Sequence, residues 1–126
     1  PNSKYNTEII VLNADRQILY ERIAKRVDIM LRNGLIEEVD NLVKCGIPWE
    51  AQSMQAIGYK EFKLYYDGAA TIEEVRSSII TNTKRYAKRQ LTWFRRYDFA
   101  KWFDIASEYD KAMVYAEKYI KNRRIL

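Results

Sequence analysis

The segment "KRYAKRQLTWFRR", residues 84–96, constrains the fold most, because it places six cations and no acid among large apolar side chains. On a helix that advances about 100° per residue, these cations fall within an arc of roughly 140°. Tyr86, Trp93 and Phe94 fall on the other side, as do Val75 and Ile79 before them. The sequence therefore predicts a long helix with one apolar side, which packs in a protein core, and one cationic side.

The cationic side of this predicted helix has three interpretations. Residues 75–97 contain seven Lys and Arg and no acid, and subtracting this +7 from the net charge of +5 leaves −2 for the rest. A solvated amphipathic surface helix is the simplest interpretation. However, neighbouring cations without acidic partners repel one another by about 0.2–0.5 kcal/mol per pair, which favours an external polyanion such as a phosphate backbone. A membrane surface is less favoured, because the apolar side is needed for the core.

The rest of the chain predicts a mainly α fold with one or two short strands, within a single segment, residues 1–126. "TEIIVLN" predicts a short buried strand at about residues 8–12, and "FAKWFD" predicts a last strand at about 100–104. The first predicted helix begins at Asp15 and is stopped by Asn33 and Gly34, and others are predicted over residues 35–45, 54–68 and 107–124. The long cationic helix is predicted to begin at a capping box formed by Thr71 and Glu74. The first strand has no evident partner, and the chain begins with proline, so we expect a piece of a larger protein.

Composition excludes several kinds of chemistry. The chain has no histidine and a single cysteine, Cys45, which excludes an internal disulfide, a zinc cluster and the usual histidine-based nucleophile arrangements. Its apolar runs are too short to span a bilayer, so we expect a soluble chain in a reducing compartment, the cytoplasm. No metal-ligating residues are predicted. Any chemistry must use carboxylates, arginines or groups from elsewhere.

Two arginines interrupt the apolar side of the first predicted helix. With Ile18 set to zero, Arg22 falls near 40° and Arg26 near 80°, between Ile29 at roughly 20° and Leu19 at roughly 100°. A guanidinium in such a place needs an anion. It could be a carboxylate from another element or the phosphate oxygens of a ligand, and the pattern alone leaves both open.

Five motifs together carry a resemblance to a known family. The motifs "LYERIAKRVDIML", "GLIEEVDNL", "SMQAIGYKEF", "NTKRYAKRQLTWFRR" and "WFD" appear in this order between about Glu8 and Asp104. Each is weak alone, but their order and spacing resemble the C-terminal part of bacterial tRNA dimethylallyltransferases, also called tRNA isopentenyltransferases. The resemblance implies that the chain is the C-terminal helical part of a P-loop-type α/β enzyme.

The resemblance also implies an activity and its site residues. Members of the family transfer a dimethylallyl group from dimethylallyl diphosphate to N6 of the adenosine on the 3′ side of the anticodon. By resemblance, Arg26 is a ligand of the diphosphate and Arg22 supports it. The residues that match regions contacting the tRNA anticodon arm are Glu50, Ala51, Gln52, Ser53, Met54, Gln55, Asn82, Thr83, Lys84, Arg85, Tyr86, Ala87, Lys88 and Arg89.

The catalytic groups of such an enzyme are expected outside this chain. The sequence contains no phosphate-binding loop of the form GxxxxGKS or GxxxxGKT. The resemblance places that loop, the Mg²⁺ ligands and the general base in the N-terminal half. We therefore expect this chain to be inactive alone and the parent enzyme to be a monomer. Self-association of the piece is a possibility that the sequence leaves open.

Two other functions remain possible from the sequence. One is a stand-alone, non-catalytic helical RNA-binding module, which a start codon directly before "PNSKYN" would support. The other is a helical protein-interaction domain whose cationic helix meets an acidic partner. Salt-sensitive tRNA binding would argue against the second.

Overall fold

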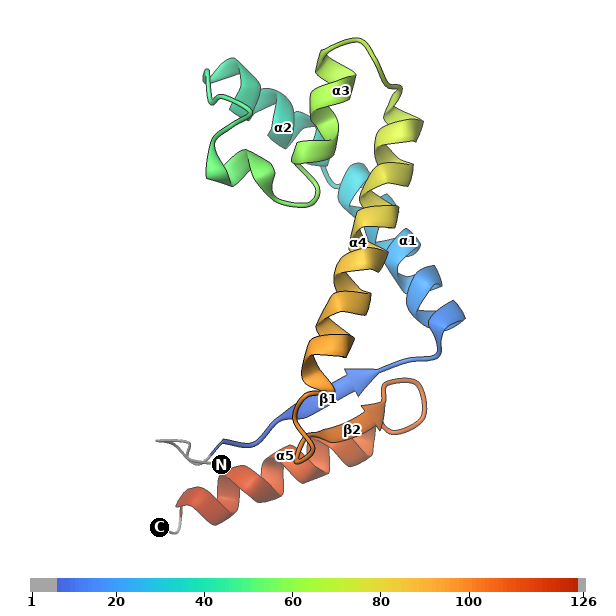
Figure 1. The fold of residues 1–126 in the computed structure, drawn as a ribbon, viewed down its shortest axis with the longest axis vertical. Coiled ribbons are helices and arrows are strands. Elements are labelled where there is room, and N and C mark those ends of the chain that lie inside the picture. The colour runs from blue at the N-terminus through green and yellow to red at the C-terminus, as the bar shows by residue number, and fades with distance from the viewer. Residues whose placement is uncertain (1–6, 125–126) are drawn as a thin grey trace. The chain divides into compact units, whose positions relative to one another are not determined.

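The computed structural model describes residues 7–124, which form two compact units. One unit is built from residues 7–19 and 89–124, near the two ends of the chain, and the other from residues 20–88. Figure 1 labels the helices and strands, and the mainly α composition with two short strands confirms the predicted content. Whether the whole chain is one domain stays a prediction.

The unit made from the chain ends contains a two-stranded parallel sheet and a helix. Strand β1 (Ile10–Asn13) pairs with β2 (Lys101–Asp104) in a register that places Val11 beside Trp102. Helix α5 (Tyr109–Arg124) packs against both strands (Figure 1). The prediction that the first strand has no partner in the chain was wrong, because "FAKWFD", itself correctly predicted as a strand, supplies that partner.

Burial along β1 also differs from the prediction of a fully buried strand. The side chain of Val11 is 5% exposed, whereas that of Leu12 is 44% exposed. Successive side chains of a strand point to opposite faces, so only one face of this sheet is covered within the unit. On α5, the ring of Tyr115 lies 5.9 Å from that of Phe103, and its hydroxyl donates a hydrogen bond to Glu8.

Helices surround the core of residues 20–88. Its elements are α1 (Arg16–Arg32), α2 (Leu35–Lys44), the 3-10 helices η1 (Gln52–Gln55) and η2 (Lys60–Phe62), α3 (Lys63–Tyr66) and α4 (Ile72–Phe94), of which α1 begins and α4 ends in the other unit. The buried residues that form the core cluster are Val27, Leu35, Val39, Phe62, Val75 and Ile79. Val27 of α1 and the predicted apolar start of α4 therefore meet in this core. The prediction that Arg22 and Arg26 interrupt a buried side of the first helix was wrong, because both arginines are exposed and Ile29 beside them is 41% exposed.

The predicted helix over residues 54–68 was wrong. This stretch contains η1, then a turn at residues 56–59, and then η2, which α3, a single turn, follows directly. Gly58 adopts a φ of 102°, a left-handed conformation that a continuing α-helix does not allow. Its N–H donates to the Glu61 carboxylate, 2.8 Å away, so the interruption is held by a side chain.

The end of α2 was predicted more closely. The helix ends at Lys44, and Gly46 follows with a φ of 78°. The Gly46 N–H bonds the Val43 carbonyl at 3.0 Å, and the Ile47 N–H bonds the Leu42 carbonyl at 3.3 Å. These two bonds form a Schellman motif, in which glycine is the favoured residue.

An ion pair ties α1 to α4 within residues 20–88. Arg76 donates from Nε to Asp28 at 2.5 Å and from Nη2 at 3.0 Å, and its Nη1 lies 3.3 Å from Glu73. The hydrogen bond from Arg76 lowers the pKa of Asp28, so the pair persists at neutral pH and is lost only on acidification below the usual range of an aspartate. This contact fixes how the two helices pack beside the core.

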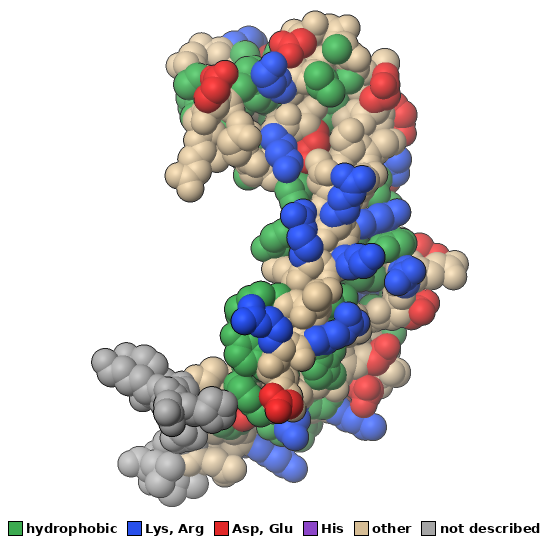
Figure 2. All heavy atoms as spheres, in the orientation of Figure 1, with side chains coloured by type: hydrophobic (Ala, Val, Ile, Leu, Met, Phe, Trp, Pro, Cys, Tyr) green, Lys and Arg blue, Asp and Glu red, His purple; other side chains and the backbone are tan. Residues whose placement is uncertain are grey.

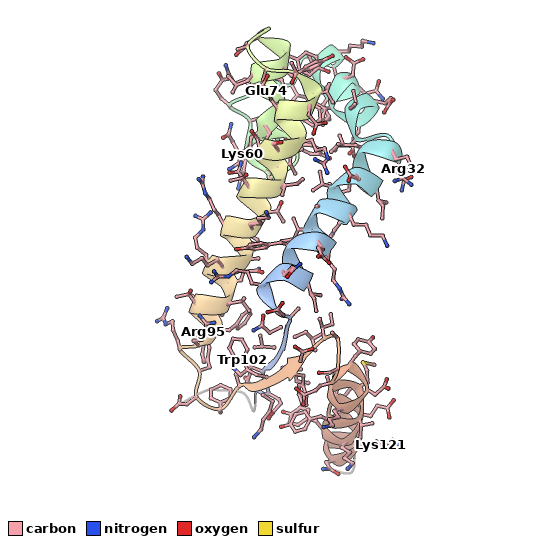
Figure 3. All side chains as sticks on the ribbon, turned by 90° about the vertical axis from the view of Figure 1, so that its right-hand side faces the viewer. Arg32, Lys60, Glu74, Arg95, Trp102 and Lys121 are labelled. Carbon is pink, nitrogen blue, oxygen red and sulfur yellow. The ribbon has the colours of Figure 1, made fainter. Side chains whose placement is uncertain are left out.

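The predicted capping box at the start of α4 is present. Thr71 Oγ1 accepts from the Glu74 N–H at 3.1 Å, and Glu74 Oε1 accepts from the Thr71 N–H at 3.2 Å. Figure 3 labels Glu74 at this end of the helix. The reciprocal bonds satisfy two backbone donors that the helix itself leaves without partners.

We predict that Thr71→Ala destabilises this end of α4 by about 1 kcal/mol, because the cap is lost. Hydrogen exchange of amides in residues 72–79, followed by mass spectrometry, should become about fivefold faster. Ser77→Ala, at an exposed position of the same helix, is the control and should leave exchange almost unchanged. Equal exchange in both variants would show that the box does not stabilise the helix.

Candidate nucleic-acid interface

The cationic side of α4 lies at the surface. Arg85, Lys88 and Arg89 are exposed, and Figure 2 shows Lys and Arg side chains gathered over this helix. Within residues 7–122, no ion pair or hydrogen bond involves the guanidinium of Arg85 or Arg89. Their charge is therefore available to an anion outside the chain.

Lys84 plays a different part from these arginines. It is half-buried, and its Nζ lies 4.4 Å from the centroid of the Tyr20 ring on α1. A cation over an aromatic face contributes about 0.5–1 kcal/mol at an exposed site. Lys84 therefore helps to hold α4 against α1, and Ala87 and Thr83 are also half-buried on the helix.

The apolar side of α4 is less buried than predicted. Val75 and Ile79 are 1% exposed, but Tyr86 is 50% and Trp93 is 47% exposed. The Trp93 ring contacts Phe94 at 5.1 Å and Tyr97 at 5.2 Å. Beyond Ile79, then, Tyr86 and Trp93, which were predicted to lie in a core, are partly exposed.

Arg95 follows the end of α4 and lies over an aromatic ring. Its guanidinium carbon is 5.9 Å from the centroid of Trp102 on β2, and Figure 3 labels both residues. Both belong to the unit made from the chain ends. This contact places the cation within range of a weak cation–π interaction.

The predicted RNA-contacting loop, residues 50–55, presents most of its polar side chains outward. Glu50, Gln52, Ser53 and Gln55 are exposed, Ala51 is half-buried, and Gln55 Nε2 donates to the Trp49 carbonyl at 2.5 Å. Met54 is fully buried. It anchors the loop in the unit and presents no surface to a ligand in this conformation.

Glu61, which was not among the predicted site residues, links Asn82 to the turn that follows the predicted RNA-contacting loop. Glu61 is 8% exposed, and its Oε1 accepts from Gly58 at 2.8 Å while its Oε2 accepts from Asn82 Nδ2 at 2.7 Å. Gly58 follows the loop, and Asn82 opens the segment 82–89. The sequence feature that could have indicated this role is an acidic residue inside "AIGYKEF", directly before the apolar Phe62.

Arg22 and Arg26 are exposed on α1. No carboxylate in the part of the chain that the structure describes pairs with either one. The structural ion pair that the sequence left open is therefore not formed among these residues. Contact with a diphosphate stays a prediction for both.

Three other features of the described residues concern ligand binding, metal binding and the membrane. Residues 20–88 contain a surface hollow of about 570 Å³ between the end of α1 and α2, lined by Ile29, Met30, Asn33, Gly34, Leu35, Glu37, Glu38 and Asn41. Among the described residues, no group of three His, Cys, Asp or Glu side chains lies close enough to hold a metal ion, so they offer no ligand cluster for Mg²⁺. None of the described helices has the length and apolar character needed to cross a bilayer.

Two tyrosines close to the loop remain protonated donors. Burial, together with a hydrogen bond to Asp40, raises the pKa of Tyr66 to about 12, and its hydroxyl lies 3.0 Å from the Asp40 Oδ1. Burial also raises the pKa of Tyr59, with a smaller contribution from Glu38. Neither phenol is suited to act as a general base near neutral pH.

Comparison with known proteins gives a consistent result. The family model described as IPP transferase matches residues 1–97. The chain is 55% identical over 104 residues to a tRNA dimethylallyltransferase of Clostridioides difficile, covering 82% of the chain and 33% of that protein. It is 46% identical over 112 residues to that of Shouchella clausii, covering 89% of the chain and 36% of that protein. The chain thus spans about a third of the length of these curated relatives.

Two solved structures share the fold. The full-length tRNA isopentenylpyrophosphate transferase of Bacillus halodurans matches 95% of the chain and 40% of its own, with a TM-score of 0.86 and 45% identity. The tRNA isopentenylpyrophosphate transferase of Staphylococcus epidermidis matches 96% of the chain and 39% of its own, with a TM-score of 0.83 and 39% identity. These matches confirm the predicted fold class.

Proposed function

Since the chain belongs to the IPP transferase family, we propose that it forms the tRNA-binding and diphosphate-contacting part of a tRNA dimethylallyltransferase. The complete enzyme would transfer a dimethylallyl group from dimethylallyl diphosphate to N6 of the adenosine on the 3′ side of the anticodon. This proposal places the activity in the cytoplasm, with the tRNA anticodon arm as the macromolecular partner.

The exposed cationic side of α4 is the observation that best supports the proposal. Arg85 and Arg89 make no internal ion pair within the described residues, and residues 75–97 contain no acid that could neutralise them. Such a row of cations binds a phosphate backbone with an affinity that falls as salt rises. The exposed part of Tyr86 offers a ring on which a base could stack.

The reaction assigns a different task to α1. When the allylic carbon leaves dimethylallyl diphosphate, negative charge grows on the departing diphosphate and must be stabilised. Arg26, supported by Arg22, would supply this charge from an exposed position without having to break an internal ion pair. Mg²⁺ would neutralise the diphosphate further, and we assign its ligands to the rest of the enzyme because the described residues offer no cluster of three ligands.

The target base must leave its stack to meet the donor. Enzymes that act on a base of a folded nucleic acid hold the backbone while the base is turned out. We assign the holding step to the loop 50–55 and to segment 82–89. The bonds of Glu61 to Gly58 and Asn82 would hold the start of segment 82–89 against the turn that follows the loop.

We predict that the double variant Arg85→Ala and Arg89→Ala of the complete enzyme binds tRNA about ten- to a hundredfold more weakly, because two charged contacts are lost. The slope of log affinity against log salt should decrease by roughly two contacts. Both quantities can be measured by fluorescence anisotropy with labelled tRNA between low and physiological salt.

The matched control for this experiment is Lys118→Ala with Lys121→Ala. Both lysines are exposed on α5, so the control removes the same charge from another helix (Figure 3 labels Lys121). It should change affinity and slope much less than the α4 variant. Equal effects from both variants would indicate only general attraction by net charge, and no effect from either would leave α4 as a solvated surface helix.

A further inference from the structure

The buried carboxylate of Glu61 fixes the orientation of the Asn82 side chain. An ionised carboxylate can only accept hydrogen bonds, and both of its oxygens are used here. Oε1 accepts from the Gly58 N–H at 2.8 Å, and Oε2 accepts from Asn82 Nδ2 at 2.7 Å. The amide nitrogen of Asn82 therefore faces Glu61, and its carbonyl oxygen, Oδ1, is held away from it.

The Asn82 Oδ1 atom reaches the surface of the unit. Asn82 is half-buried, and within the described residues its Oδ1 makes no hydrogen bond. In the same part of the chain, no buried side-chain nitrogen or oxygen lacks a hydrogen-bond partner. Oδ1 is therefore not buried, and Asn82 presents a hydrogen-bond acceptor of fixed orientation to whatever lies against α4.

The position of Asn82 limits which donor this acceptor can meet. Arg85 lies three residues further along α4, so the two side chains share one side of the helix. If Arg85 holds a phosphate of an RNA strand, the atoms that lie next to it belong to the sugar–phosphate backbone. All of these backbone oxygens are acceptors only, except for the ribose 2′-hydroxyl, which can also donate and which DNA lacks.

We propose that Glu61 is a positioning residue that orients Asn82 so that Oδ1 accepts a hydrogen bond from a ribose 2′-hydroxyl of the bound RNA. The inference rests on the proposed function, since it needs an RNA strand on α4. Glu61 and Asn82 would then help to distinguish RNA from a backbone that lacks the 2′-hydroxyl. The arginines would supply affinity that does not depend on the sugar.

Glu61→Gln tests the orientation without removing the side chain. The glutamine Oε1 can still accept from the Gly58 N–H, but its Nε2 must then face Asn82. Two amide nitrogens are both donors and cannot form a hydrogen bond with each other. The Asn82 amide is therefore expected to turn, so that its oxygen faces residue 61 and its nitrogen faces outward. The variant would keep the hydrogen bonds of the fold and present a donor where the native protein presents an acceptor.

The experiment compares complete enzymes with an anticodon stem-loop RNA in which one loop ribose at a time carries a 2′-methoxy group. A methoxy group keeps the acceptor oxygen and removes the donor. The quantity compared is the affinity for the hydroxyl form divided by the affinity for the methoxy form. At one ribose position this ratio should be about three- to tenfold higher for the native enzyme than for Asn82→Ala. Asn82→Ala measures the steric effect of the methyl group, because it lacks the amide.

Glu61→Gln should prefer the hydroxyl form no more than Asn82→Ala does, with an unchanged salt slope and melting temperature. A Glu61→Gln enzyme that discriminates like the native one would overturn the positioning role. If there is no ribose position at which the native enzyme discriminates better than Asn82→Ala, the 2′-hydroxyl contact is wrong. If Asn82→Ala in that case weakens binding of all the stem-loops alike, the partner of Oδ1 is a base N–H instead. Should Glu61→Gln fail to fold, the native and Asn82→Ala comparison still decides the contact.

Failure of the proposed function would look different. In that case the native enzyme itself would show no salt-dependent binding of the unmodified stem-loop. Salt-dependent binding by the native enzyme without discrimination at any ribose would leave the proposed function in place and overturn only the assignment of Asn82.

Discussion

Arg26→Ala in the complete enzyme is expected to lower kcat/KM for prenyl transfer by about 30- to 1000-fold. Loss of one preorganised group that stabilises charge in the transition state costs roughly 2 to 4 kcal/mol. Stability should change little, because Arg26 is exposed and no carboxylate pairs with it within residues 7–122. Arg26→Lys should recover only part of the rate, since an ammonium cannot form the bidentate contact of a guanidinium.

The measurement combines steady-state kinetics and thermal unfolding on one preparation of each variant. Lys25→Ala is the matched control, because Lys25 is an exposed cation next to Arg26 on α1 and makes no ion pair with a described residue. It should retain nearly native turnover. A large fall in melting temperature with near-native turnover of the folded Arg26→Ala enzyme would contradict the diphosphate assignment, and so would equal rate losses in both variants.

The helices could be predicted from the sequence because their signals are local. The start of α4 depends on Thr71 and Glu74, three residues apart, and the end of α2 depends on Gly46 directly after the helix. Both are short-range rules of backbone hydrogen bonding. At these two helix ends, the prediction that needed only neighbouring residues was therefore correct.

The pairing of β1 with β2 could not be predicted in the same way. Val11 and Trp102 stand beside each other in the sheet although 90 residues separate them in the chain, and the whole unit of residues 20–88 lies between. A parallel pair needs a long crossover connection, and nothing in either short strand specifies its partner. The interruption at Gly58 was missed although its stabilising partner, Glu61, is only three residues away, because no general rule pairs a carboxylate with a glycine N–H at this spacing inside an apparent helix.

The candidate site was partly predictable for related reasons. Exposure of Arg85 and Arg89 followed from the charge pattern along one helix. The half-exposed Trp93 and the fully buried Met54 did not, because burial depends on which elements pack together. The same limit hid Glu61, whose role depends on its contacts with Gly58 and Asn82.

Phe62→Ala is expected to destabilise the unit of residues 20–88 by about 3–5 kcal/mol, the usual cost of truncating a buried aromatic ring. Phe62 is fully buried in the core cluster with residues of α1, α2 and α4. Local hydrogen exchange in the complete enzyme is the suitable measurement, because unfolding of a protein with several units is not two-state. Amides of α2 and of residues 72–88 should exchange about two to four orders of magnitude faster.

Leu64→Ala is the matched control for this prediction. Leu64 lies two residues further along and is 56% exposed, so its truncation should change stability by less than about 0.5 kcal/mol. Exchange in β2 and α5 should stay nearly native in Phe62→Ala, because these elements belong to the other compact unit. Faster exchange by the same factor in both units would show that they unfold together, and unchanged exchange in α2 would show that Phe62 does not support the core. Because Glu61 directly precedes Phe62, loss of the ring should also loosen the hydrogen bonds to Gly58 and Asn82, so tRNA binding should weaken in Phe62→Ala and not in Leu64→Ala.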